Sequence, residues 1–215
     1  MIISIVGSGG KTTLLKKLAA QYRSEGKRVF VTTTTHMFLE ENMLLTDDPD
    51  TIIRALQEDG FAIAGLSDGK KICALSEETY EAVCAHADVV LVEADGSRMH
   101  PLKYPRETEP VIPENTDEII VVCGLNAIGQ KAKEVCHRLE LVKACLGIGD
   151  DTVITPAHVQ KLVTEGYLKP LLAKYPEKRI TLAPRHNGSP HQIAVAQWLR
   201  QQADGLTGTS SENWW

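Results

Sequence analysis

The sequence predicts an α/β protein with a mainly parallel sheet that has helices on both faces. Short apolar runs of buried-strand type stand at residues 2–6, 89–92 and 119–122, separated by segments that carry helix-start signals. A glycine-rich turn and a helical segment over about residues 12–25 follow the first run directly. Strands that alternate with helices favour parallel pairing, since each helix carries the chain back across the sheet.

The other elements are predicted from local signals. The β-branched stretch over residues 28–35 indicates a second strand, and residues 179–182 indicate the last one. A hairpin is expected where residues 61–64 and 71–74 flank a Ser-Asp-Gly turn, and residues 127–147 carry helical character. Four more helices are expected where a capping residue or an early proline stands. These starts are Pro49, Ser76, Thr155-Pro156 and Ser189-Pro190.

The length of 215 residues is enough for one α/β domain. We expect a single domain over residues 1–203, in which residues 97–117 form a proline-rich lid or loop, because four prolines stand there among charges. Residues 204–215 are polar and glycine-containing apart from Trp214-Trp215, which predicts a loosely held tail. The ligand crevice of a parallel sheet lies at the carboxyl ends of its strands.

The composition is that of an ordinary soluble globular protein, with 43% hydrophobic and 24% charged residues. A net charge of -5 without a basic segment argues against nucleic acid as the main partner. No apolar run approaches the roughly 20 residues of a membrane span, and Met1 leads into the first strand without a basic segment, so neither membrane insertion nor secretion is expected. The five cysteines form no Cys-x-x-Cys pair, and a cytoplasmic, reduced protein is the simplest interpretation.

The glycine-rich turn reads Gly7-Ser8-Gly9-Gly10-Lys11-Thr12-Thr13. Backbone N–H groups at a helix N-terminus face an anion, and the helix dipole favours negative charge there. The lysine adds a mobile cation for the phosphates of ATP or GTP, and the hydroxyl of Thr12 can reach Mg²⁺. The spacing is shorter than the standard Walker A motif, because only two residues separate the first and last glycines. In this respect the loop resembles that of the Mur-type ligases. The motif and its strand–turn–helix context predict a protein similar to the P-loop NTPases.

Two carboxylates follow the strand at residues 89–92. Glu93 and Asp95 stand two residues apart, and side chains two apart on a strand point to the same face. A triphosphate with Mg²⁺ needs such groups, either to hold the water shell of the metal or to orient an attacking water. We therefore expect Lys11, Glu93 and Asp95 to be catalytic, with one acid acting on the metal and the other on water.

Each of the other candidates also has a structural alternative, which for the loop cations, His137-Arg138 and the cysteines is the favoured one. The run Thr32–Thr35 and His36 end the second strand on the crevice side, although a threonine run is also simply a good strand. Arg98, Lys103 and Arg106 on the proline-rich loop either close onto an anionic ligand or are solvated cations. His137-Arg138 is expected to be a surface pair in a helical region, and the cysteines are expected to be small core residues, with Cys123 the least certain.

The ordered motifs resemble the YqeC family, accessory proteins for the maturation of selenium-dependent molybdenum hydroxylases. The resemblance runs over roughly residues 3–170 and rests on VGSGGKTT at 6–13, the threonine run at 32–35, VEADGSR at 92–98, PLK at 101–103, EPVIP at 109–113, GLNAIG at 124–129, HR at 137–138 and ITP at 154–156. The C-terminal part departs from the pattern. Ala183-Pro184-Arg185-His186-Asn187 stands where an Asn-x-x-Asp-like base-recognition segment is expected, which leaves the base unassigned.

The resemblance implies a nucleotide-binding protein that helps to insert or modify a molybdenum cofactor, with a molybdenum hydroxylase or its cofactor-maturation proteins as partners. The residues themselves support Mg²⁺-dependent binding of a nucleotide and its hydrolysis. Two alternatives remain open at this point. One is a small-molecule kinase or ATP-dependent ligase, suggested by the short loop, and the other is a nucleotide-gated binding module that does not hydrolyse its ligand.

Overall fold

The computed structural model describes residues 1–39, 41–212 and 214. These residues group into two compact units. The first unit comprises Met1–Ile5, Thr12–Gly96 and Val111–Asp117. The second comprises Val6–Lys11, Ser97–Pro110 and Glu118–Trp215.

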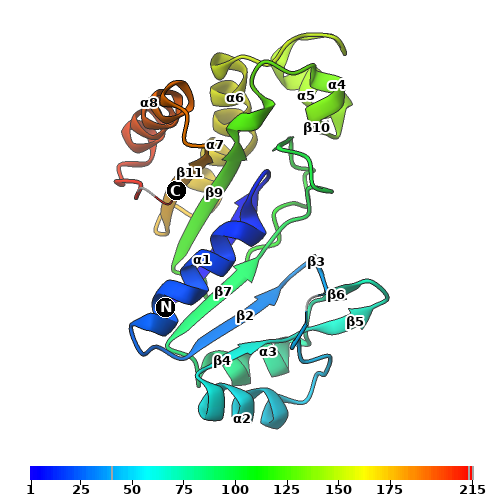
Figure 1. The fold of residues 1–215 in the computed structure, drawn as a ribbon, viewed down its shortest axis with the longest axis vertical. Coiled ribbons are helices and arrows are strands. Elements are labelled where there is room, and N and C mark those ends of the chain that lie inside the picture. Colours follow the sequence, from blue (N-terminus) through cyan, green and yellow to red (C-terminus); the bar gives the residue numbers. More distant parts are fainter. Residues whose placement is uncertain (40, 213, 215) are drawn as a thin grey trace. The chain divides into compact units, whose positions relative to one another are not determined.

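Parallel strands form the core of the first unit (Figure 1). Strand β1 (Ile2–Gly7) pairs with β7 (Val89–Glu93), which pairs with β2 (Val29–Thr33), and β4 (Phe61–Ile63) follows at the edge. The register places Glu93 beside Ile5 on one side and beside Thr33 on the other. All five residues of β2 and of β7 are buried, as expected of strands covered on both faces.

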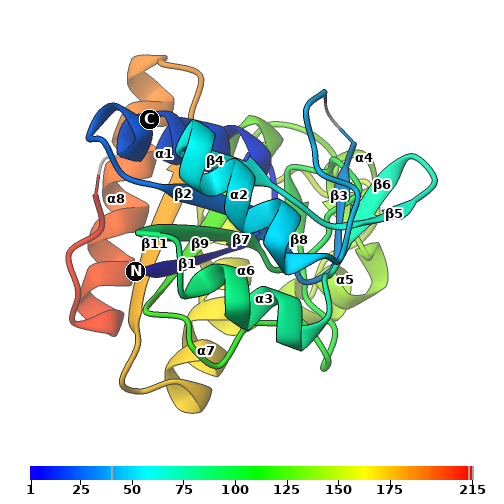
Figure 2. The same ribbon diagram turned by 90° about the horizontal axis from the view of Figure 1, so that it is seen from below.

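Helices cover both faces of these strands, as the sequence predicts. Helix α1 (Lys11–Ser24) and helix α3 (Glu77–Cys84) lie on opposite faces (Figure 2). Helix α2 (Pro49–Asp59) packs at β4 and begins as expected, since Asp48 accepts a hydrogen bond from the Thr51 amide and Pro49 takes the first helical position. Ser76 caps α3 in the same way through the Thr79 amide.

The predicted hairpin is wrong in one of its strands. Phe61–Ile63 pairs in parallel with β2, and the antiparallel partner of β6 (Lys71–Cys73) is β5 (Leu66–Asp68). A third strand, β3 (His36–Phe38), pairs with the other edge of β6. Gly69 has a φ of +65° in the turn, so the turn signal was correct. The apolar residues of 61–63 are used instead to extend the parallel sheet.

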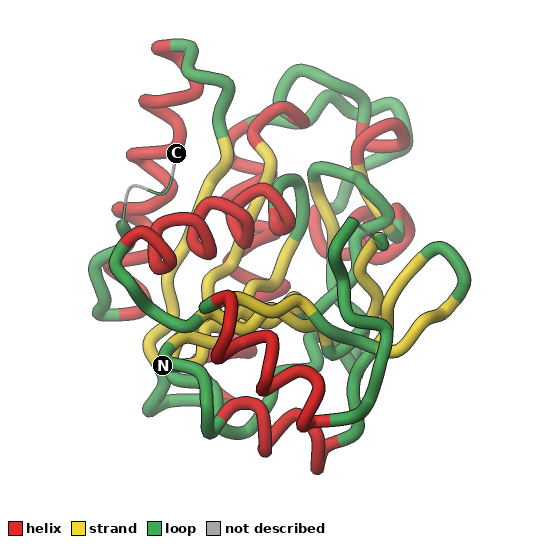
Figure 3. Tube along the Cα trace, turned by 60° about the horizontal axis from the view of Figure 1, so that its bottom comes forward, coloured by secondary structure: helices red, strands yellow, loops and turns green. Residues whose placement is uncertain are grey.

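The second unit is built around two long parallel strands. Strand β9 (Glu118–Gly124) pairs with β11 (Arg179–Arg185) over seven residues. Helix α8 (Pro190–Thr207) packs against β11 (Figure 3). Helix α6 (Pro156–Val163) continues through a π-helical turn, η2 (Thr164–Leu168), into α7 (Lys169–Lys174). The start of α6 is a capping box, in which Thr155 and His158 each bond the backbone of the other.

Residues 127–147 do not form one helical region. They contain the end of a 3₁₀ turn, η1 (Leu125–Ala127), then α4 (Ala132–Val135), β10 (Cys136–His137) and α5 (Leu139–Leu146). Strand β10 pairs in parallel with β8 (Leu102–Lys103), which lies in the proline-rich segment. Arg138 has left-handed backbone angles, φ 59° and ψ 58°, which separate the strand from α5. The expectation of a helical surface pair at His137-Arg138 is therefore wrong.

The segment after residue 203 is held by hydrogen bonds. Helix α8 extends to Thr207, the Thr209 hydroxyl donates to the Ile180 carbonyl at 2.6 Å, and the Ser211 hydroxyl accepts from the Leu182 amide at 3.1 Å. Trp214 is buried, with 6% of its surface exposed. Trp215 lies outside the described residues. The contacts beside β11 contrast with the loosely held tail that the composition suggests.

Candidate functional site

The glycine-rich loop connects β1 to α1, and close backbone contacts in the second unit fix its shape. Gly7 has a φ of +90°, and a β-carbon there would lie 2.1 Å from the Val122 carbonyl oxygen. Gly9 has a φ of +76°, and a β-carbon there would lie 2.6 Å from the Pro101 carbonyl oxygen. Both positions therefore require glycine, because any side chain would meet backbone atoms that cannot move aside easily.

Ser8 ties the loop to its surroundings. Its amide donates to the Val122 carbonyl at 2.8 Å, and its hydroxyl donates to the Pro101 carbonyl at 3.0 Å. Within the described residues, no acceptor takes a hydrogen bond from the Gly9 or Gly10 amide. These amides, together with the first turn of α1, are the donors that face an anion at the helix N-terminus.

Lys11 places a positive charge at the N-terminus of α1. The first turn of α1 contains no acidic residue. Lys11 is buried, with 4% of its surface exposed, and its Nζ donates to the Gly7 carbonyl at 2.9 Å. The same Nζ lies 3.5 Å from the Ser97 hydroxyl, a contact that the sequence analysis did not foresee. The lysine is thus folded back onto the loop, where its ammonium donates to a carbonyl oxygen that a phosphate oxygen can replace.

The structure brings the loop threonine to the acidic strand end within the first unit. The Thr12 hydroxyl donates to Glu93 Oε2 at 3.2 Å. Glu93 is the last residue of β7 and is 6% exposed, and Asp95 is fully buried two residues later. Both carboxylates are therefore largely removed from bulk water. In this less polar environment a charge interacts more strongly with a metal ion or a phosphate than it does at the surface.

The donor set fits a magnesium ion with a bound phosphate. Mg²⁺ prefers oxygen ligands and keeps several waters, so one or two protein oxygens suffice. Thr12 and Glu93 present a hydroxyl and a carboxylate in contact with each other. In the described part of the chain, no group of three or more His, Cys, Asp or Glu side chains is arranged as a metal site.

Three hydroxyls of the threonine run bond backbone carbonyl groups. The hydroxyls of Thr32, Thr33 and Thr34 donate to the carbonyls of Ala64, Glu93 and Val111, at 2.9, 2.8 and 2.6 Å. The Thr35 hydroxyl oxygen is buried, and no described residue hydrogen-bonds it. His36 lies on β3, where its Nε2 is 3.1 Å from Asp68, so it belongs to the small antiparallel sheet.

Three cations of the proline-rich segment have different environments. Arg98 and Arg106 are exposed. Lys103 is fully buried, and its Nζ lies 2.8 Å from Glu109 Oε2, so it is neither a solvated cation nor free to swing onto a ligand. Arg138 Nη2 donates to Glu109 Oε1 at 2.6 Å, and its Nη1 contacts Oε2. Sequence reasoning missed Glu109 as the common partner, although its place in the EPVIP motif was a signal.

The charges of this network hold Glu109 ionised. Burial by itself would raise the pKa of Glu109, but hydrogen bonds from Arg138 and Lys103, with the charge of Lys103, lower it to about 2. The His137 pKa moves in the opposite sense to that of an ion-paired histidine. Burial, together with the charges of Arg138 and Lys103, lowers it to about 4.

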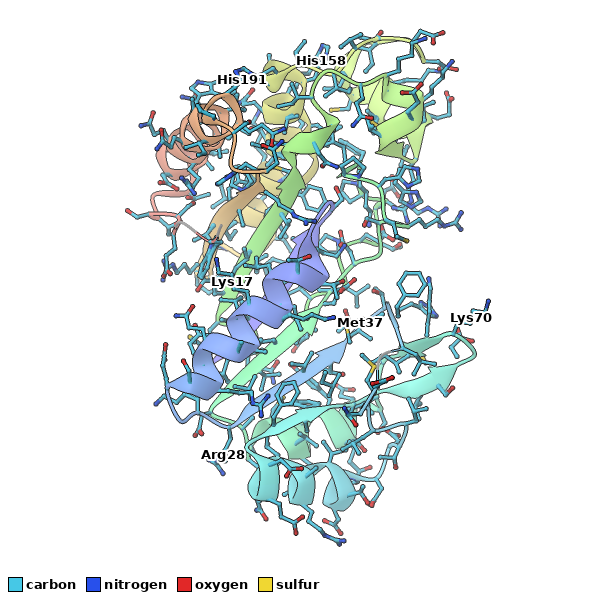
Figure 4. The ribbon with its side chains drawn as sticks, in the orientation of Figure 1. Lys17, Arg28, Met37, Lys70, His158 and His191 are labelled. Carbon is cyan, nitrogen blue, oxygen red and sulfur yellow. The ribbon has the colours of Figure 1, made fainter. Side chains whose placement is uncertain are left out.

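The remaining candidates carry no evident chemistry. Burial raises the pKa of Cys123 to about 12 and that of Cys136 to about 11, so neither is a thiolate at neutral pH. His158 caps α6, and His191 stands in the first turn of α8 (Figure 4).

No helix in the described ranges has both the length and the apolar character that a membrane crossing requires.

The parallel strands and the strand–loop–helix unit at Gly7–Lys11 define an α/β protein of the P-loop type. The chain matches the profile of the YqeC protein family over residues 3–140. It is 34% identical over 171 residues to "Uncharacterized protein YqeC" of Escherichia coli (strain K12), which covers 75% of this chain and 67% of the relative. The chain therefore belongs to the YqeC family.

Two solved structures from Aquifex aeolicus are similar in fold. The "MinC:MinD cell division protein complex" has a TM-score of 0.49 at 10% identity and covers 98% of this chain and 78% of that chain. The "MinD cell division protein" has a TM-score of 0.43 at 10% identity and covers 98% of this chain and 79% of that chain.

Proposed function

We propose that the chain binds ATP or GTP with Mg²⁺ at the Gly7–Thr13 loop and hydrolyses it. The observation that carries the proposal is the hydrogen bond between the Thr12 hydroxyl and the Glu93 carboxylate. It joins the residue after the loop lysine to the acid that ends β7. A strand-end carboxylate beside the loop threonine is the arrangement that Mg²⁺-dependent phosphate chemistry uses.

Each residue has a defined task in this proposal. The Gly9 and Gly10 amides and the first turn of α1 bind phosphate oxygens, and Lys11 leaves the Gly7 carbonyl to pair with them. Thr12 and one of the two acids, Glu93 or Asp95, hold the metal directly or through water, while the other acid orients the attacking water. When bound, Mg²⁺ neutralises charge on the phosphate oxygens and fixes their orientation.

We further propose that nucleotide turnover drives the maturation of a selenium-dependent molybdenum hydroxylase or of its cofactor. The support is membership of the YqeC family together with the ordered motifs that extend beyond the loop. Hydrolysis coupled to a client enzyme predicts a low basal rate that rises when the client is present.

A second candidate function is transfer to a small-molecule acceptor, as in a kinase or ligase. One observation favours it. The first unit has a cavity of about 480 Å³ at the end of β2, lined by Thr32–Thr34, Tyr80 and residues 111–115 among others. This volume is within the range of small-molecule sites. Glu77, Glu81 and Glu114 also line the cavity, so it suits a neutral or cationic acceptor better than an anion.

Calorimetric titration with Mg-ATP and Mg-GTP tests nucleotide binding. Lys11→Ala should abolish it, because losing a charge-assisted contact of about 1.5–3 kcal/mol alone weakens binding more than tenfold. Lys27→Ala, which removes an exposed lysine near the other end of α1, is the matched control and should bind normally. Equal affinities for the two variants would refute the site.

Turnover assays separate the three functions. Phosphate release from ATP or GTP that increases with a molybdenum hydroxylase supports the accessory NTPase. Nucleotide consumption that depends on a small molecule, with phosphate passing to it, supports the kinase or ligase. Tight binding without turnover, even with the client, identifies a nucleotide-gated binding module and refutes hydrolysis.

A further inference from the structure

A cationic cluster in the second unit has no role in the nucleotide chemistry described above. We call it the His100–His137 cluster, and it consists of Arg98, His100 and His137, backed by Lys103, Glu109 and Arg138. The pairing of β8 with β10 sets His137 beside Lys103 in register. The rings of His100 and His137 stack with their centroids 5.8 Å apart and their planes 25° apart.

The cluster has more positive than negative charge. Its permanent cations are Arg98, Lys103 and Arg138, and its single carboxylate, Glu109, is engaged by the last two. Arg98 is exposed and its guanidinium has no hydrogen-bond or ion-pair partner among the described residues. Three cations against one carboxylate leave an excess of two positive charges beside two imidazoles. Such an excess attracts an anion and repels a metal ion.

The backbone of the cluster is held in uncommon conformations. Of the residues that the structure describes, four non-glycine residues have positive φ, and three of them lie here: Arg98 at 48°, Met99 at 66° and Arg138 at 59°. Residues in this region cost free energy and gather where a structure positions side chains for a ligand. The left-handed turn at Arg98 and Met99 also lets the His100 Nδ1 lie 3.1 Å from the Arg98 carbonyl, which fixes the ring so that Nε2 is the nitrogen left for a ligand.

We propose that Arg98, His100 and His137 bind a tetrahedral oxyanion, either inorganic phosphate or a phosphomonoester. A dianion matches the excess of two charges, and phosphate oxygens accept hydrogen bonds from both a guanidinium and imidazole N–H groups. The inference is independent of nucleotide binding, because it uses none of the residues of the glycine-rich loop.

Anion binding at this cluster should take up a proton. In the free protein His137 is neutral at neutral pH, because burial and the surrounding cations Arg138, Lys103 and Arg98 oppose its protonation, as would a charged His100. A bound dianion reverses the sign of the nearest charge and favours the imidazolium. The affinity for the phosphate dianion, calculated after allowing for the protonation of free phosphate, should therefore increase as the pH falls toward the pKa of His137 in the complex.

The test is an NMR titration of the histidine ring resonances with inorganic phosphate, at constant ionic strength maintained with NaCl. It is run on the wild type and on Lys11→Ala, in which the glycine-rich loop no longer provides a phosphate site. We expect saturable shifts at His100 and His137 in both proteins, a rise of at least one unit in the pKa of His137, and little change at His191 on α8. A parallel titration with glycerol phosphate shows whether a phosphomonoester binds more tightly than free phosphate.

Arginine variants give the decisive comparison. Arg98→Ala should weaken phosphate binding at least tenfold, and Arg54→Ala, which removes an exposed arginine elsewhere, should not. Arg98→Gly provides a second variant, since glycine tolerates the positive φ and keeps the loop conformation. Shifts that do not saturate, or that are the same in the Arg98 variants, would overturn the proposal. If Lys11→Ala lost phosphate binding and the Arg98 variants kept it, the phosphate would belong to the glycine-rich loop, and the proposal would also be overturned.

Discussion

Replacing Glu109 with glutamine should destabilise the protein far more than an ordinary surface substitution. The change keeps the shape of the side chain but removes the counter-charge of Lys103, which is fully buried, and of Arg138, whose side chain is 13% exposed. Breaking a buried ion pair by removing one partner costs about 3–5 kcal/mol, because the remaining charge is left uncompensated. For a chain of this length the melting temperature should fall by about 6–20 °C.

The assay is urea unfolding followed by far-ultraviolet circular dichroism, with Asp151→Asn as control. Asp151 also bridges two cations, Lys131 at 3.0 Å and Lys133 at 2.9 Å, but all three side chains are 45% to 65% exposed. Exposed pairs contribute about 0–1 kcal/mol, so the control should differ little from the wild type. Equal losses in the two variants would refute the argument that burial of Lys103 makes the network important.

The pH dependence supplies an independent check. The native pKa of Glu109 is about 2, below its usual value of 4.5, so its stabilising contribution is complete above 4.5 and is lost as the pH falls toward 2. The difference in stability between the wild type and Glu109→Gln should therefore be constant above about pH 5 and should narrow in more acidic solution. A difference that stays the same at pH 3 and pH 6 would show that the carboxylate is not stabilised by the two cations.

Three further predictions follow from single contacts. Gly7→Ala should lower the free energy of unfolding by more than about 3 kcal/mol in thermal unfolding, since the added β-carbon meets the Val122 carbonyl at a positive φ. The control is Gly205→Ala within α8, which has open space around it. This control should be neutral or should raise the free energy of unfolding by about 0.5–1 kcal/mol. Thr12→Val should weaken nucleotide binding more in the presence of Mg²⁺ than in EDTA, whereas Thr12→Ser should keep the metal dependence; equal effects would contradict a metal role. NMR should give His137 a pKa of about 4, and stability should increase with pH between 4 and its usual 6.5, because the unfolded chain binds the proton more tightly.

Elements with strong local signals were predictable from the sequence. The first strand, the glycine-rich turn and α1 were found because an apolar run, glycines and a helical pattern follow each other within 24 residues. The starts of α2, α3, α6 and α8 follow capping residues or prolines. The hairpin and the region after residue 127 were misjudged because strands of two or three residues have no periodicity of their own. Whether such short segments form strands is determined by their pairing with strands that are distant in the sequence.

The candidate site shows the same division. A sequence motif and the alternation rule were enough to select Lys11, Thr12 and Glu93, and the structure places the Thr12 and Glu93 side chains in contact. The Lys103–Glu109–Arg138 network was not predictable, since its members are separated by up to 35 residues and a loop cation is usually solvated. Lys103 differs from a typical loop cation because it is buried, and a buried charge must be paired.

The short loop determines which groups can meet the charge of a phosphate. Two residues rather than four separate Gly7 from Gly10, and one of the amides between them, that of Ser8, is bonded to β9. Fewer backbone donors remain for an anion than a standard loop offers, so side-chain cations must provide a larger share of the attraction. Lys11 is one such cation, and its Nζ lies beside Ser97, the residue that begins the segment with Arg98 and His100. In this chain the attraction for phosphate at the loop therefore rests more on Lys11 than it would in a loop of standard length.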